Sequence, residues 1–134
     1  MEPEVADLLA ELDPCLFVID CLPNMASAEI TERTVPLVRR IRRDRPETPI
    51  LLAEDRTYAN TRFFPAKMER HRSTRAAWHD LIGEGVGNIH YLDGDGLLPD
   101  DGEAKVDSSH PTDLGMVAYA DAYEAAIRPI LHQA

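Results

Sequence analysis

An aspartate and a histidine three residues apart are the strongest candidates for chemistry in this sequence. Asp107 and His110 lie in the stretch Val106-Asp107-Ser108-Ser109-His110-Pro111, just ahead of a predicted helix. An imidazole can act as a general base near neutral pH, and a carboxylate that accepts its other N–H fixes its tautomer. The spacing therefore favours a catalytic pair, which still needs a nucleophile and an oxyanion donor. The competing interpretation is structural, because His-Pro can simply begin a helix.

Composition narrows the classes of protein to which the chain could belong. Its 134 residues are enough for one domain, spanning 1–134, and the formal net charge of −10 disfavours nucleic acid and anionic lipid surfaces as partners. No apolar run approaches the ~20 residues that span a bilayer. The acidic start Met1-Glu2-Pro3-Glu4 does not resemble an export signal, so a cytoplasmic location is expected. Cys15 and Cys21 flank a predicted strand and are expected to be free, buried thiols.

Short apolar runs alternate with longer amphipathic segments along the chain. The runs at 15–19, 49–53 and 88–92 are typical of buried parallel strands. Helices are predicted over 2–12, 29–43, 66–82 and 112–131. This order predicts an α/β fold, a three-layer α/β/α sandwich around a parallel sheet of about three strands.

The helix predictions include specific buried faces. The first helix is expected to bury Val5, Leu8, Leu9 and Leu12, and Pro36 predicts that the second begins near residue 35 or is kinked there. The third helix has a weak stripe, with Met68, Ala76, Ala77, Trp78, Leu81 and Ile82 on its expected buried side. The last helix is expected to turn inward Met116, Val117, Ala120, Ile127, Ile130 and Leu131.

Polar residues follow each predicted strand. The carboxyl ends of parallel strands share one edge of a sheet, where ligands bind in open α/β folds. That edge would hold residues 20–24, 54–60, 93–95 and 107–110, with 56–65 as a candidate substrate rim. Asn24 lies on the same edge and could donate its side-chain amide to an oxyanion, although it could equally be an ordinary turn residue.

At this point the residues carry a family resemblance. Asp20-Cys21-Leu22-Pro23-Asn24-Met25 and Asp107-Ser108-Ser109-His110-Pro111-Thr112-Asp113-Leu114-Gly115 resemble blocks III and V of the SGNH (GDSL-like) hydrolases, most closely the bacterial lipase/acylhydrolase branch. Stretches 34–39, 49–52 and 54–58 are similar to that branch as well. The resemblance implies a flavodoxin-like sandwich that hydrolyses acyl or acetyl esters, including those of carbohydrates. It implies His110 as general base, Asp107 as its orienting carboxylate and Asn24 as an oxyanion donor.

The sequence departs from this family at its start. The family's nucleophilic serine belongs to a GDS-type block, and a glycine in a second block donates to the oxyanion; neither block is found here. The available serines lack an activating turn or adjoin His110 too closely: Ser27, Ser73, Ser108 and Ser109. The sequence is therefore expected to be an N-terminally truncated hydrolase domain, with no nucleophile of its own.

Two functions follow as competing hypotheses. The first is a serine ester hydrolase whose nucleophile lies outside these residues, so that this chain alone is inactive; the second is a non-catalytic binding or interaction domain. A metal site formed by Asp107, His110 and Asp93 or Asp95 is a remote third possibility, and no cofactor is expected. In the family's strand order the missing strands would pair along 15–19. An unpaired apolar edge there predicts marginal stability or self-association.

Overall fold

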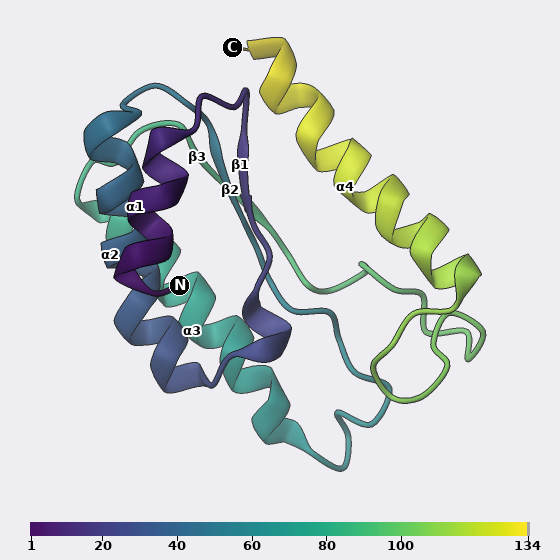
Figure 1. Ribbon diagram of the computed structural model, residues 1–134. Helices are drawn as coiled ribbons and strands as arrows, with labels where there is room; N and C mark the ends of the chain where they lie inside the picture. The colour runs from purple at the N-terminus through teal and green to yellow at the C-terminus, as the bar shows by residue number, and fades with distance from the viewer. Residues whose placement is uncertain (134) are drawn as a thin grey trace.

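A parallel sheet with helices on both faces organises the molecule (Figure 1). The computed structural model describes residues 1–133. Its elements in chain order are α1 (Pro3–Glu11), β1 (Phe17–Ile19), the 3-10 helix η1 (Leu22–Asn24), α2 (Ser27–Asp44), β2 (Ile50–Ala53), the 3-10 helix η2 (Pro65–Met68), α3 (Glu69–Gly83), β3 (Ile89–Leu92) and α4 (Asp113–Gln133). The predicted alternation of helices and strands is confirmed, and so is the α/β fold class.

The three strands lie in the order β1-β2-β3, and both pairings are parallel. Val18 lies opposite Leu51, and Leu51 lies opposite His90. Every residue of the central strand β2 is buried, because strands flank it on both sides and helices cover both faces. Within the described residues β1 pairs only with β2, so β1 forms an edge of the sheet.

Helices α1, α2 and α3 cover one face of the sheet, and α4 lies across the other (Figure 1). Helix α2 packs Leu37, Val38 and Ile41 into the main core, where all three are at most 3% exposed. The helix begins at Ser27, where the Glu29 carboxylate accepts the Ala26 amide, and it continues through Pro36. Of the two alternatives at Pro36, a start near residue 35 is wrong, because tertiary packing outweighs the ~3 kcal/mol cost of an interior proline, and a kink there stays a prediction.

Helix α1 only partly turns its predicted face inward: Leu9 is half-buried against the core, and the other three predicted residues are exposed. Ala6 and Ala10 are buried, whereas Val5, Leu8 and Leu12 are 43%, 64% and 54% exposed. The small alanines allow α1 to approach α2 closely. Arginines of α2 and its C-cap then fix this orientation: Arg40 pairs with Asp7 at 2.5 Å, and Arg45 donates to the Ala10 and Glu11 carbonyls.

Helix α4 also departs from its predicted packing. Ile130 is buried as expected, but Met116, Val117 and Leu131 are 58%, 60% and 42% exposed, and Ala120 is exposed as well. The helix lies obliquely over the sheet, away from α1–α3 (Figure 1). An apolar stripe predicts that a helix face is suited to burial, and the elements available to cover it decide whether it is buried.

Helix α3 has an inward face that is partly polar, which explains its weak apolar stripe. Its buried residues are His71, Thr74, Ala77 and Leu81, whereas Ala76 and Ile82 are exposed. Both cysteines are free as expected, but Cys15 is exposed rather than buried. Within residues 1–133, no helix combines the length and apolar character needed to cross a membrane.

Candidate active site

Asp107 and His110 form a hydrogen-bonded pair at the start of α4. His110 Nδ1 lies 2.8 Å from Asp107 Oδ2, and because an ionised carboxylate only accepts, Nδ1 must be the donor. The other oxygen, Asp107 Oδ1, accepts the backbone amides of Ser109 at 2.6 Å and His110 at 2.8 Å. The carboxylate therefore fixes both the tautomer of the imidazole and the turn that carries it.

The two side chains of the pair have different roles: Asp107 is a stable anion, and His110 has an exposed ring nitrogen. Hydrogen bonding from the His110 side chain, followed by the His110 and Ser109 amides, lowers the pKa of Asp107 well below its usual range. Asp107 therefore remains ionised at neutral pH. The His110 side chain is 75% exposed. With Nδ1 donating to Asp107, Nε2 carries the lone pair and is open to a reacting group.

The loop that carries the pair is held by backbone hydrogen bonds. Lys105 and Pro111 form an antiparallel bridge, the Val106 amide donates to the His110 carbonyl at 2.8 Å, and the Thr112 amide donates to the Ala104 carbonyl at 3.0 Å. A Cβ on Gly115 would lie 2.1 Å from the Ala104 carbonyl oxygen. Glycine is therefore required at this position, because the first turn of α4 packs directly against the loop.

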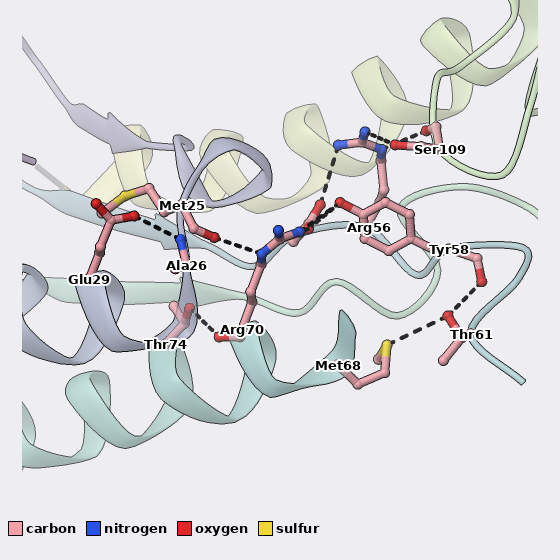
Figure 2. A network of polar contacts seen from close by, with 11 residues as sticks. Met25, Ala26, Glu29, Arg56, Tyr58, Thr61, Met68, Arg70, Thr74 and Ser109 are labelled. Atoms are coloured by element: carbon pink, nitrogen blue, oxygen red, sulfur yellow. Dashed lines mark hydrogen bonds and ion pairs between the residues drawn. The ribbon is translucent and has the colours of Figure 1, made fainter. Parts of the chain in front are cut away.

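Asn24 ends η1, just beyond β1, and its side chain is exposed. The carboxyl ends of the parallel strands meet at one edge of the sheet, and residues 54–60 and 107–110 lie there too. A chain of polar contacts joins the segment after Asn24 to the His110 loop, passing through Met25, Arg70, Asp55, Arg56 and Ser109 (Figure 2).

Two buried carboxylates support this edge, and the sequence placed them there without indicating that structural role. Glu54 and Asp55 follow β2 directly, and both are completely buried. Asp55 accepts from Arg56, Arg70 and the Tyr58 hydroxyl, the last at 2.6 Å. Their position directly after a fully apolar strand could have predicted that they are buried. A buried carboxylate needs partners, so this position also indicates a cluster of hydrogen-bond donors around them.

Glu54 ties β2 to the rest of the scaffold. It accepts from His71 Nδ1 at 3.1 Å, Arg75 at 2.9 Å, the Gly94 amide at 2.8 Å and the Tyr91 hydroxyl. Burial alone would raise the pKa of Glu54, but the hydrogen bonds from His71, Tyr91, Gly94 and Arg75 outweigh it and lower the pKa to about 2. Glu54 is therefore a structural group that stays ionised at neutral pH.

The expected substrate rim borders a hollow of about 430 Å³. Its walls come from residues 57–62 and from the loop 95–105, including Tyr58, Arg62, Asp95, Asp100 and Lys105. The Ala59 amide donates to the Ser108 carbonyl at 3.0 Å, which joins this rim to the catalytic loop. The hollow therefore lies beside the loop that carries Asp107 and His110, but neither of these two residues lines it.

The serines and the remaining acidic residues have other surroundings. Ser27 begins α2, Ser73 lies within α3, and the Ser109 hydroxyl bonds to Arg56. Asp93 pairs with Arg75, and Asp95 accepts the Thr57 hydroxyl. Among the residues that the structure describes, no three His, Cys, Asp or Glu side chains are grouped so as to hold a metal ion.

The architecture is shared with solved structures of other proteins. A crystallised protein of Bacteroides ovatus, described as a GDSL-like lipase, superposes with a TM-score of 0.92 at 34% identity, over 98% of this chain and 40% of its own. The salicylyl-acyltransferase SsfX3 of a tetracycline biosynthetic pathway gives 0.78 at 21% identity, over 96% of this chain and 41% of its own. A peptidoglycan O-acetylesterase gives 0.59 at 14% identity, over 99% and 42%. The last two similarities concern the fold alone.

These similarities define the class of protein as an α/β domain with the SGNH hydrolase fold. A sequence model of the GDSL-like lipase/acylhydrolase family matches residues 1–128. The chain therefore belongs to that family, as the resemblance of its sequence motifs predicted. It spans about 40% of the length of the solved relatives. A comparison with curated protein sequences finds no match.

Proposed function

We propose that this chain provides the base, its orienting carboxylate and an oxyanion donor of a serine ester hydrolase. The observation that carries the proposal is the 2.8 Å hydrogen bond between His110 Nδ1 and Asp107 Oδ2, beside an exposed imidazole. An imidazole oriented in this way can act as a general base, because Nε2 has a lone pair that can accept a proton. Membership of the GDSL-like family supports an ester as the substrate class.

In the proposed reaction His110 Nε2 takes the proton from a serine hydroxyl as the serine oxygen attacks the ester carbonyl. A C–O bond forms, and the carbonyl electron pair moves onto the oxygen to give a tetrahedral oxyanion. When that intermediate collapses, the alcohol leaves and receives the proton from His110. Water then attacks the acyl-enzyme with His110 again acting as base, which releases the acid and restores the serine.

The other two residues act through electrostatics. Asp107 keeps Nδ1 protonated and stabilises the imidazolium that forms in each half of the reaction. Asn24, exposed at the end of η1, donates its side-chain amide to the oxyanion. The serine is proposed to come from sequence outside these 134 residues, because none of the serines discussed above is presented in an activating turn.

A fusion tests this proposal. The region of the Bacteroides ovatus protein that precedes its matched segment is joined ahead of Met1, and hydrolysis of p-nitrophenyl acetate is measured. The expected result is turnover by the fusion and none by the chain alone. The experiment requires that the fusion be folded, which circular dichroism checks.

Variants of the fusion separate the enzyme from a binding domain. Asp107→Asn is expected to reduce kcat by about 10²-fold or more, because the imidazole loses its fixed tautomer. Arg72→Ala is the matched control, since Arg72 is 68% exposed and, among the described residues, pairs with the nearby Glu69. A fusion that is folded but does not hydrolyse the ester, or whose turnover does not depend on Asp107, would favour the non-catalytic interpretation.

A further inference from the structure

We propose that the buried carboxylate of Asp55 is the common anchor of the two loops that carry the site, with Arg56 and Arg70 as positioning residues. Arg56 joins Asp55 to the His110 loop, and Arg70 joins it to the loop of Asn24. This inference rests on the proposed function for its significance in catalysis, but the contacts that carry it are independent of any reaction.

The first arm runs from Asp55 to the His110 loop. Arg56 Nη1 lies 3.3 Å from Asp55 Oδ1, while its Nε donates to the Ser109 carbonyl at 2.6 Å and its Nη2 donates to the Ser109 hydroxyl. The guanidinium is thus bonded to main chain and side chain of one residue (Figure 2). Ser109 lies inside the turn that Asp107 closes, so Arg56 restrains the turn from outside.

The second arm runs from Asp55 to the other loop. Arg70 Nη1 lies 3.2 Å from Asp55 Oδ2 and 3.1 Å from the Tyr58 hydroxyl, and Arg70 Nε donates to the Met25 carbonyl at 2.7 Å. Met25 follows Asn24 directly, and its amide closes η1 by donating to Leu22. Figure 2 shows this arm reaching Met25 from α3.

Burial explains why the carboxylate can act as an anchor. Asp55 is completely buried, and its two oxygens divide their partners: Oδ1 faces Arg56, whereas Oδ2 faces Arg70 and Tyr58. A buried carboxylate with fixed hydrogen bonds holds its donors more firmly than an exposed one, because water cannot replace them. Arg56 is itself only 9% exposed. Both loops are therefore held, through Arg56 and Arg70, by the same buried side chain at the end of β2.

Amide hydrogen exchange, read by NMR on the 134-residue chain, tests each arm separately. Arg56→Ala is expected to speed exchange of the Ser109 and His110 amides by about tenfold or more and to leave Asn24 and Met25 unchanged. Arg70→Met is expected to do the reverse. Asp55→Asn is expected to speed exchange in both loops, since it weakens both arms.

Controls distinguish positioning from general loss of stability. The Ile50 and Leu81 amides in the core report global unfolding, and Arg72→Ala is the matched surface arginine on α3. Arg56→Lys is expected to give an intermediate rate at Ser109, because one ammonium keeps the charge but cannot bond both Ser109 groups as the guanidinium does.

The proposal is overturned if either loop fails to respond to its own arginine, or if Asp55→Asn alters one loop only while Ile50 and Leu81 stay protected. Should Asp55→Asn unfold the chain, the two arginine variants decide the question. The measurement needs no turnover, so its failure would leave the ester-hydrolase proposal standing, and an inactive fusion would leave the anchor standing.

Discussion

Among the described residues, two carboxylate–imidazole pairs have similar hydrogen-bond geometry but very different solvent exposure. His71 Nδ1 lies 3.1 Å from Glu54 Oε2, and both side chains are buried, at 8% and 0% exposure. His110 Nδ1 lies 2.8 Å from Asp107 Oδ2, and these side chains are 75% and 55% exposed. In both pairs Nδ1 donates to the carboxylate. In the buried pair, Nε2 of His71 is enclosed and has no hydrogen-bond partner among the described residues.

The difference shows what turns such a pair into a candidate base. A hydrogen bond to Nδ1 selects the tautomer, but only access to Nε2 allows proton transfer to a substrate. Gly94 packs so closely against the His71 ring that a Cβ there would lie 2.6 Å from Cε1. His71 is therefore a structural residue, and His110 has the exposure that the proposed reaction requires.

The largest effect is expected from His110→Ala in the fusion described above. Loss of the general base should reduce kcat/KM by about 10³-fold or more, while the free energy of unfolding changes by less than ~0.5 kcal/mol because the side chain is exposed. Ester hydrolysis and urea denaturation measure the two quantities. A large loss of stability with unchanged turnover would reverse the roles assigned to the two histidines.

The acid side of the stability profile should depend on the buried pair. The pKa of Glu54 is lowered to about 2 from an ordinary 4.5, so its contribution is complete above about pH 4.5 and is lost as the pH falls toward 2. That shift corresponds to about 3 kcal/mol. Glu54→Gln should therefore flatten the dependence between pH 5 and 2, measured by urea unfolding.

Asp107→Asn is the matched control for that measurement. The pKa of Asp107 is lowered as well, so its contribution has the same sign, but solvent screening at its exposed position makes the contribution small. If Asp107→Asn flattened the profile as much as Glu54→Gln does, the contrast between the buried and the exposed carboxylate would be wrong.

A smaller effect is expected from His71→Ala. Removing a buried ring and its hydrogen bond to Glu54 should reduce the free energy of unfolding by about 2 kcal/mol. The kcat of the folded fusion should stay within about twofold of its starting value. The hydrogen bonds that join Asp55 to the two site loops run through Arg56 and Arg70 and do not involve His71. A loss of kcat comparable with that of His110→Ala would indicate that the buried pair takes part in catalysis.

The smallest effect on stability is expected at the edge of the sheet. Val18 on β1 is 39% exposed, and a lysine on an edge strand discourages pairing with another chain. Val18→Lys should reduce self-association in sedimentation velocity while altering the free energy of unfolding by less than about 0.5 kcal/mol. Val106→Lys, on an exposed loop residue, is the control and should leave association unchanged. A wild-type chain that stays monomeric at high concentration would contradict the expected association through this strand.

Much of the fold followed from periodicity, and the site followed only in part. Each of the three strands falls within a predicted apolar run: Phe17–Ile19, Ile50–Ala53 and Ile89–Leu92. A short apolar run between turn residues is too short for a helix and fits a buried strand. Helix faces were harder to predict: Leu8 of α1 and Met116 of α4 lie on apolar stripes yet are exposed. A stripe is a local property, whereas burial depends on which neighbour lies opposite.

The sequence by itself determined the order of helices and strands and the pairing of Asp107 with His110, because three residues of separation bring those side chains together within a single turn. Only the tertiary structure decided what surrounds them. Arg56 meets Ser109 across 53 residues, and Arg70 meets Met25 across 45. Contacts of that kind depend on the parallel sheet that brings distant chain segments to one edge, and no local spacing encodes them.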